Sequence, residues 1–227
     1  MNQKIKSAIK KNSLLNKLAR KVEKLKVKAR PAISGKNNIV INKGVLFDVK
    51  YDILGNDNRV EIKQGAVLSN ILIYIRGDRH QLTIGNDCRI KGGSIWFEDN
   101  DCRVEIGQKT TIESAHLAVT EPGRKIMIGE DCMFSNAIEL RTGDSHSIID
   151  ISTGKRINPA QDIIIGNHVW VGAHSIILKG VHIGDNSIIG TNSLVTKDVP
   201  AHSISAGIPA KILRDNIDWR RERIYDK

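Results

Sequence analysis

Aliphatic side chains recur every six residues in the C-terminal third of the chain. They occupy six successive repeat positions: Ile165, Val171, Ile177, Ile183, Ile189 and Val195. A helix places apolar residues about every 3.6 positions and an amphipathic strand every two, so neither element alone explains a strict period of six. A hexapeptide repeat is typical of a parallel β-helix, in which six residues form one short strand and one corner. The pattern therefore predicts an all-β solenoid.

A second set of positions in the same stretch carries small side chains. It lies two residues before the next aliphatic position and comprises Val169, Ser175, Val181, Ser187, Ser193 and Val199. We expect both sets to point inward, because alternating large and small side chains fill a narrow interior closely.

The N-terminal half of the repeat region has longer units. Its anchors recur at one constant spacing, at Ile62, Ile84, Ile106 and Ile128. The six-residue period predicts inward side chains at positions 62, 68 and 74, then 84, 90 and 96, then 106, 112 and 118, and then 128, 134 and 140. Each coil would thus hold three hexapeptides and four extra residues at one corner, whereas the coils from Ile165 and Ile183 hold three hexapeptides alone. Such coils stack into a triangular prism, since each strand pairs with the strand one coil away.

One unit contains a long insertion. About 15 extra residues separate Leu140 from Ile165 when the coil is compared with its neighbours. Long loops in a regular scaffold usually have a functional role. This loop contains His146.

The two ends of the chain are expected to differ from the repeats. Apolar positions between residues 4 and 28 follow a helical pattern that ends before Pro31. The sequence also suggests a short helix over 215–225, capping the last coil. We therefore divide the chain into a basic helical arm (1–30), a β-helix (31–214) with a catalytic loop (141–164), and a C-terminal cap (215–227).

The charge of the chain is concentrated in the arm. The net charge is +10, and residues 1–30 hold eleven basic side chains and one acidic side chain, so the remainder is neutral. The arm is open to three interpretations: it packs on the body or on copies of itself, lies on an anionic membrane surface, or holds an anionic polymer. The sequence lacks a signal-peptide pattern and an apolar run of membrane-spanning length, which predicts a cytoplasmic protein, with the arm placing it peripherally at the inner membrane in the second interpretation.

The three cysteines do not form a disulfide framework pattern. Cys88 and Cys132 lie four residues after Ile84 and Ile128, at the small inward position, and are expected to be buried. Cys102 lies outside that register, and the sequence assigns it no role.

Residues 128–214 resemble the hexapeptide-repeat acyltransferases, above all the maltose/galactoside acetyltransferases and the capsule or lipopolysaccharide O-acetyltransferases. The similarity rests on IGEDC at 128–132, the loop with His146, IIIGNHVWVGAH at 163–174, and the segment from IGDNSI to GIPAKILR. Residues 40–127 match by repeat type only, and residues 1–30 do not match. The resemblance implies a left-handed β-helix, a homotrimer with active sites between subunits, and acetyl-CoA as the acyl donor.

The resemblance also implies roles for the loop. His146 would be the general base that takes the proton of an acceptor hydroxyl. Asp144 or Asp150 would orient its ring, with Asp144 preferred. Glu113 stands where the sugar acetyltransferases have an acceptor-contacting Asn, which leaves the acceptor open and makes Glu113 a rival partner for His146. We expect Glu113, Arg141 and Trp170 to contact the acceptor.

The donor is expected to follow the narrow C-terminal coils, which lack the corner inserts. Trp170 would be a stacking platform for pantetheine or sugar. The resemblance, carried over position by position, implies that the coenzyme contacts Trp170, Ala173, Thr191, Thr196 and Lys197. Lys211 and Arg214 would meet its phosphates.

Four functions remain open from the sequence. The first is an acetyl-CoA-dependent O-acetyltransferase acting on a bacterial surface polysaccharide or its precursor. The second is an N-acetyltransferase acting on a nucleotide-linked amino sugar. The third is a zinc enzyme of the γ-carbonic anhydrase type, which needs three convergent histidines, whereas His168 and His174 are one hexapeptide apart and would point from different faces. The fourth is a scaffold without activity. We expect the first, with no metal and no nucleic-acid partner.

Overall fold

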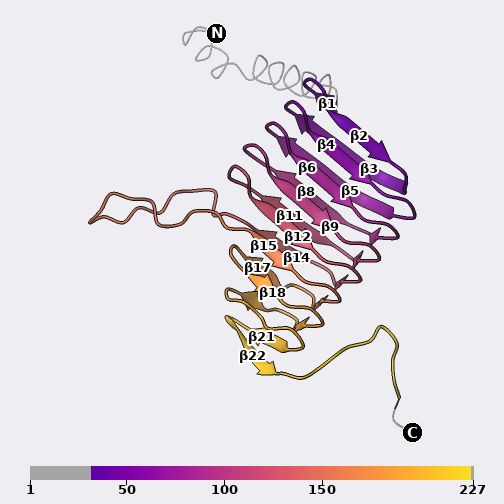
Figure 1. The fold of residues 1–227 in the computed structure, drawn as a ribbon, viewed down its shortest axis with the longest axis vertical. Helices are drawn as coiled ribbons and strands as arrows, with labels where there is room; N and C mark the ends of the chain where they lie inside the picture. Colours follow the sequence, from indigo (N-terminus) through magenta and orange to yellow (C-terminus); the bar gives the residue numbers. More distant parts are fainter. Residues whose placement is uncertain (1–31, 226–227) are drawn as a thin grey trace, which may run out of the picture.

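The chain winds into a parallel β-solenoid. A computed structural model describes residues 32–225, and the arm predicted over residues 1–30 lies outside them. The coils stack along one axis, and a single long loop projects from their side (Figure 1). Because each short strand hydrogen-bonds to strands one coil above and below, the backbone polar groups are satisfied between coils.

The coils have three faces, which we number in chain order. Face 1 is a seven-stranded sheet. Its strands are β2 (Ile39–Asn42), β4 (Arg59–Ile62), β6 (Gln81–Ile84), β9 (Arg103–Ile106), β12 (Lys125–Ile128), β15 (Ile163–Ile165) and β18 (His182–Ile183).

Faces 2 and 3 form one fifteen-stranded sheet, because β3 (Val45–Leu54) and β5 (Val67–Arg76) run along both faces. Asp48 and Asn70 have φ of 49° and 54° within these strands, and such left-handed residues bend a strand. Face 2 continues through β7 (Arg89–Ile90), β10 (Thr111–Ile112), β13 (Met133–Phe134), β16 (Trp170–Val171), β19 (Ile188–Ile189), β21 (Ile204–Gly207) and β22 (Ala210–Arg214). Face 3 comprises β1 (Ile33–Ser34), β8 (Gly93–Phe97), β11 (Ala115–Val119), β14 (Ile138–Arg141), β17 (Ile176–Leu178) and β20 (Leu194–Val195).

Strand register divides the solenoid into two regions. Ile62 pairs with Ile84, and Ile84 pairs with Ile106, so these coils, which we call the wide coils, consist of three hexapeptides and four further residues. Ile165 pairs with Ile183, so the later coils, which we call the narrow coils, consist of three hexapeptides only. Both predicted repeat lengths are confirmed.

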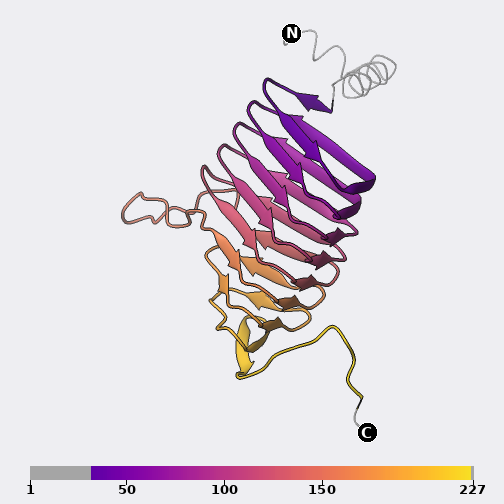
Figure 2. The ribbon, with the colours of Figure 1, turned by 45° about the vertical axis from the view of Figure 1, so that its right-hand side comes forward.

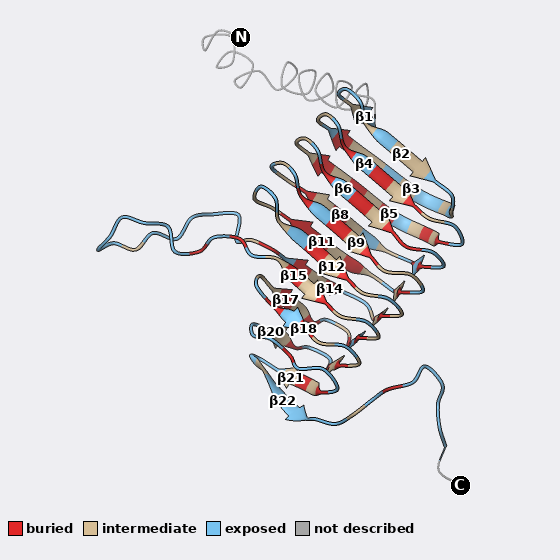
Figure 3. Ribbon diagram, in the orientation of Figure 1, coloured by how far each residue is buried: buried red, intermediate tan, exposed pale blue. Residues whose placement is uncertain are grey.

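The interior consists of aliphatic ladders that run through both regions. The six aliphatic positions from Ile165 to Val195 and the six small positions from Val169 to Val199 are all buried. Buried residues recur along the strands from the wide coils to the narrow coils (Figure 3). The inward sets read from the C-terminal repeat are therefore confirmed.

On face 3, the inward side chain predicted at position 140 is confirmed by the buried Leu140, whereas those predicted at positions 74, 96 and 118 are wrong by one residue. Ile73, Ile95 and Leu117 point inward, whereas positions 74, 96 and 118 lie on the outer side of their strands. The cause is a shorter corner. Five residues separate Ile112 from Leu117 along the chain, whereas six separate Val171 from Ile177.

The predicted C-terminal helix is also wrong. After β22, which pairs antiparallel with β21, residues 215–225 form no helix or strand. This tail docks on the corners of the coils instead. Trp219 is 6% exposed and stacks on His168, with ring centroids 4.0 Å apart. Its side-chain contacts replace the backbone bonds that a helix would supply.

The three cysteines are free and buried. Burial raises the pKa of Cys88 and Cys132 to about 11 and that of Cys102 to about 12. The burial predicted for Cys88 and Cys132 is confirmed, and Cys102 is buried too. Such thiols are protonated near neutral pH and are poor nucleophiles.

Candidate active site

The long loop occupies residues 142–162, between β14 and β15, and extends away from the coils (Figure 2). Its outer part is a narrow hairpin, in which Ile149 and Arg156 form an antiparallel bridge. His146 lies near the base of the loop and is exposed.

Asn158 fixes the base of this loop. It is 7% exposed, and its Nδ2 donates to the Asp144 carboxylate and to the His146 carbonyl, both at 2.8 Å. Its Oδ1 accepts from the Ile148 N–H at 2.7 Å. The His146 N–H in turn donates to the Asp144 carbonyl at 2.8 Å. The backbone of His146 is therefore held on both sides while its ring stays accessible.

Asp144 has other partners than the His146 ring. Its carboxylate is bound by Lys179 Nζ and by Asn158 Nδ2, and these two contacts hold the pKa of Asp144 below its usual value. Asp150 accepts from Ser152 and Thr153 within its own turn, which likewise lowers its pKa. Among residues 32–225 the His146 ring has no hydrogen-bond partner. An orienting role for Asp144 stays a prediction.

A second anchor ties the loop to the wide coils. Arg156 Nη2 binds the Glu121 carboxylate, and the other carboxylate oxygen accepts from the Ala160 N–H at 3.1 Å. The pKa of Glu121 is lowered, first by the Arg156 contact. Lys179 belongs to the narrow coils and Glu121 to the wide coils, so the loop base joins the two regions.

Glu113 and Arg141 lie on different parts of the surface. Glu113 is in the corner after β10 and accepts from Lys91 Nζ at 2.7 Å. Arg141 ends β14, and its Nε binds the Glu139 carboxylate. Among residues 32–225 of one chain, neither side chain forms a hydrogen bond or ion pair with His146.

Trp170 is 38% exposed on the outer side of β16. Its strand register places it in one column with Met133 on one side and Ile188 on the other. Ile188 pairs with Ile204, and Ile204 pairs with Arg214. One outer column therefore leads from Trp170 along face 2 to Arg214.

The other predicted donor residues fall at two corners. Ala173 and Thr191 share a corner, where the Asn192 N–H donates to the Ala173 carbonyl at 2.8 Å. Lys211 pairs with Ala206 on the strand below this corner. Thr196 and Lys197 follow β20 and lie in the next corner. The structure thus brings together Ala173, Thr191 and Lys211, and separates them from Thr196 and Lys197.

The sequence did not predict that a second aromatic side chain, Trp219, lies beside Trp170. The centroid of Trp219 lies 6.0 Å from that of Trp170, and Trp219 Nε1 donates to the His168 carbonyl at 2.7 Å. Arg221, two residues on, binds Asp131 Oδ1 at 2.9 Å and Thr111 Oγ1 at 3.0 Å. The bond from Trp219 to His168 spans 51 residues of chain and that from Arg221 to Asp131 spans 90 residues, so no local pattern could reveal these contacts.

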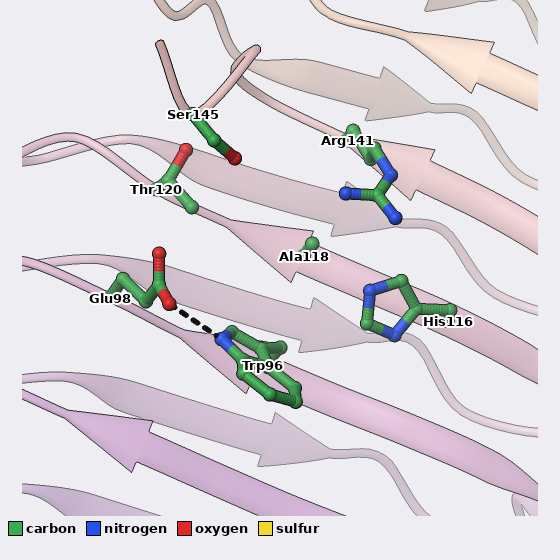
Figure 4. Close-up of a pocket in the computed structure, with 7 residues that line it drawn as sticks. All are labelled: Trp96, Glu98, His116, Ala118, Thr120, Arg141 and Ser145. Atoms are coloured by element: carbon green, nitrogen blue, oxygen red, sulfur yellow. Dashed lines mark hydrogen bonds between the residues drawn. The ribbon is translucent and has the colours of Figure 1, made fainter.

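The sequence also missed a cavity on the outer side of face 3. It has a volume of about 270 Å³ and lies beside the base of the loop. Trp96, His116 and Arg141 line it together with Ser145 (Figure 4). The sequence-based prediction placed position 96 inside the solenoid and therefore gave no sign of this cavity. The available signal was that two aromatic residues, Tyr74 and Trp96, lie one wide coil apart in the sequence.

Residues 32–225 contain no metal-binding cluster and no membrane-spanning helix. No group of three or more His, Cys, Asp or Glu side chains in this part is arranged to hold a metal ion. His168, one of the histidines considered for zinc, is bonded to Asp131 at 2.8 Å and to the Trp219 carbonyl at 3.0 Å. The same part contains no helix of sufficient length and apolar character to span a membrane.

Comparisons with known proteins agree on the repeat. Residues 162–197 match the family model described as bacterial transferase hexapeptide (six repeats). The chain is 37% identical to a polysialic acid O-acetyltransferase of Neisseria meningitidis over 76% of this chain and 80% of that protein. It is 38% identical to a polysialic acid O-acetyltransferase of Escherichia coli O1:K1, with 65% of this chain matched; the match spans 45% of the relative's length.

Two solved structures share the fold over most of their length. The polysialic-acid-specific acetyltransferase NeuO has a TM-score of 0.77 and 38% identity, covering 86% of this chain and 89% of that one. The polysialic acid O-acetyltransferase OatWY has a TM-score of 0.64 and 30% identity, covering 85% and 93%. With these matches and the hexapeptide coils of the structure, the chain belongs to the hexapeptide-repeat acetyltransferases.

Proposed function

We propose that this protein transfers an acetyl group from acetyl-CoA to a hydroxyl of a bacterial surface polysaccharide or its precursor. The observation that carries the proposal is the match over 80% of the length of a polysialic acid O-acetyltransferase. The loop adds chemical support, because it fixes the backbone of an exposed histidine.

His146 is the general base of the proposed reaction. An imidazole can take up and return a proton near neutral pH. Its nitrogen removes the proton of the acceptor hydroxyl while the hydroxyl oxygen attacks the thioester carbonyl carbon. The tetrahedral intermediate then collapses, the carbon–sulfur bond breaks, and the departing thiolate takes the proton back from the imidazolium. The products are the acetyl ester and coenzyme A, with His146 neutral again.

The donor occupies the narrow coils. The pantetheine chain lies along the column of Trp170, where an exposed aromatic ring offers a flat apolar contact. The corner of Ala173 and Thr191 continues this path to Lys211, whose ammonium and the Arg214 guanidinium meet the phosphates. Thr196 and Lys197, at the next corner, take part from another side of the coil.

The active unit is a homotrimer of left-handed solenoids. Four isoleucines of the loop, Ile148, Ile149, Ile151 and Ile157, are exposed, and Ile151 is 100% exposed. Apolar side chains gathered on a projecting loop favour an interface between copies. In such a trimer the loop of one subunit completes a site on another, so that Glu113 of one subunit approaches the acceptor beside the donor that Trp170 of another subunit holds.

The test is acetyl transfer by His146→Ala. Radiolabelled acetyl-CoA and sialic acid oligomers are the substrates, and nucleotide-linked amino sugars form a second acceptor panel. We expect kcat to fall by roughly 10² or more. His182→Ala, which changes an exposed histidine on face 1, should retain activity. Full transfer by His146→Ala would remove the mechanism, and acetylation of the amino sugars alone would replace the acceptor class.

A further inference from the structure

Aromatic side chains form a ladder on the outer side of face 3. Strand register places Tyr74, Trp96, Ala118 and Arg141 in one column on successive coils. The Tyr74 and Trp96 rings are stacked, with centroids 3.7 Å apart and planes inclined by 28°. On the other side of Tyr74, the Arg76 guanidinium lies 3.8 Å from its centroid. The ladder ends at Trp96, because the next member of the column is an alanine.

Ala118 leaves a gap between an aromatic ring and a guanidinium. Neighbouring strands lie about 4.8 Å apart, so one missing side chain opens a slot of roughly two strand spacings. The cavity of about 270 Å³ occupies this place. Figure 4 shows Trp96 on one side of Ala118 and Arg141 on the other, with Glu98, Thr120 and Ser145 along one edge and His116 along the opposite edge. We call this cavity the Ala118 gap.

The rim of the gap presents fixed polar groups. Glu98 Oε1 accepts from Trp96 Nε1 at 3.0 Å, which holds both the ring and the carboxylate in place. His116 Nδ1 is bonded to Ser94 Oγ at 2.7 Å. Burial, and then the charge of Arg141, lower the pKa of His116, so the ring is neutral near pH 7. Within residues 32–225, Arg141 uses only its Nε, in the contact with Glu139.

This combination fits one kind of ligand. A sugar ring has an apolar C–H face and a rim of hydroxyls. An aromatic ring packs against such a face, and carboxylate and guanidinium groups bind hydroxyls in fixed directions. The volume lies near the lower end of the range for small-molecule sites, which suits one monosaccharide unit. Ser145 lines the gap and precedes His146, so the gap lies next to the segment that carries the general base.

We propose that the Ala118 gap is a glycan subsite that binds one pyranose ring of the acceptor, with the ring packed on Trp96 and its hydroxyls on Glu98 and Arg141. The proposal rests on the proposed function, since the glycan is the acceptor of the same reaction. It identifies face 3 of the wide coils as the acceptor side of the enzyme.

The proposal is tested by substitutions that fill the Ala118 gap with a larger side chain. Ala118→Leu places a larger side chain on the outer side of β11, where Leu178 already occupies the same column two coils away. Thr83→Leu is the control, because it makes an outer position larger on face 1. We expect Ala118→Leu to raise the KM for sialic acid oligomers about tenfold or more, with the KM for acetyl-CoA unchanged. Thr83→Leu should change neither.

Direct binding separates this proposal from the proposed function. The Kd for a sialic acid oligomer is measured by calorimetry in the His146→Ala background, where no acetyl transfer interferes. Adding Trp96→Ala should weaken binding about tenfold, the effect of losing roughly 1.4 kcal/mol. Unchanged Kd in both gap variants would overturn the subsite. If wild-type protein acetylates no glycan, the proposed function fails on its own, whatever the Kd shows.

The alternative role of the Ala118 gap is to form part of an interface between copies of the chain. Sedimentation of Trp96→Ala and Ala118→Leu distinguishes it. A lower oligomeric state with an unchanged Kd for the oligomer would assign the gap to a subunit interface and overturn the proposal. An unchanged oligomeric state with weaker binding supports it.

Discussion

The wide and narrow coils share one interior and differ on the outside. The same aliphatic ladders run through both, as the pairing of Ile128 with Ile165 and of Ile165 with Ile183 across their boundary illustrates. The wide coils carry turn-forming corner residues, the aromatic ladder and the Ala118 gap. The narrow coils have short corners and a smooth outer column headed by Trp170. The difference teaches that four additional residues in a coil alter the surface without altering the core.

The wide corners need residues with unusual backbone conformations. Gly77 has φ of 119°, and a Cβ there would lie 1.6 Å from the Asp99 carbonyl oxygen of the next coil. Only glycine permits this approach. The two kinds of coil therefore suit the two proposed tasks: the wide coils offer side chains to an acceptor, and the plain narrow coils accommodate a long donor. The loop with His146 lies between them.

The largest expected effect in this comparison comes from the narrow coils. Trp170→Ala removes the proposed pantetheine platform and should raise the KM for acetyl-CoA about tenfold, as expected for the loss of an aromatic contact of roughly 1.4 kcal/mol. Initial rates at saturating glycan give this KM. The KM for the glycan should stay the same, and Trp170→Phe should retain most of the donor affinity. A rise in the glycan KM alone would place Trp170 on the acceptor side and break the division between the coils.

A smaller effect is expected from the tail, which begins at the narrow coils and ends on the wide ones. Trp219→Ala removes the ring stacked on His168 and should raise the KM for acetyl-CoA about threefold, because Trp170 loses a neighbour 6.0 Å away. In a Trp96→Phe/Trp219→Ala variant Trp170 is the one tryptophan left of three, and its acrylamide quenching should exceed that in a Trp96→Phe/Trp219→Phe variant, which keeps an aromatic ring at position 219. Arg223→Ala is the control in the same tail. An unchanged donor KM together with unchanged quenching would show that the tail does not position Trp170.

The inward positions of the solenoid could largely be predicted from the sequence, because they recur at a regular spacing along the chain. Each inward side chain must match the side chain one coil away, so Ile62, Ile84 and Ile106 repeat in the sequence as they repeat in space. Side chains on the outer side of the strands need not match the side chain one coil away, so they show no such repeat. A corner one residue shorter sufficed to turn Tyr74 and Trp96 outward, and this shift concealed the proposed glycan subsite.

Contacts between distant segments escaped the sequence entirely. Asn158 binds the His146 carbonyl across 12 residues of loop, and Arg221 reaches Asp131 across 90 residues. Both depend on how the loop and the tail fold back, which a period of six cannot encode. His146 itself was identified through resemblance to a family and through the length of its loop, since nothing in its immediate neighbours distinguishes it from the other six histidines.

The smallest expected effect concerns the stability of the wide coils. His80 is buried at a corner, where its Nδ1 accepts from the Cys102 N–H at 3.2 Å. Burial lowers the pKa of His80, so the folded state favours the neutral ring. The unfolded chain binds the proton more readily, at its ordinary pKa of about 6.5. The contribution of His80 to stability is therefore complete above that pH and is lost as the pH falls toward the lower folded value.

His80→Asn tests this directly, because asparagine already fills the same corner one and two coils earlier. Asn58 Oδ1 accepts from the His80 N–H at 2.9 Å, and Asn38 Oδ1 accepts from the Asn58 N–H at 3.1 Å. The variant should keep the ladder and lose the titration. Between pH 7 and pH 5, the wild type should lose on the order of 1 kcal/mol more unfolding free energy than the variant, about the net value of one hydrogen bond. Urea unfolding at both pH values measures the difference, and parallel pH profiles would contradict it. Because the substitution lies on the inner side of a wide coil, kcat and both KM values should be unaffected, which separates the stability of the coils from the chemistry on their surface.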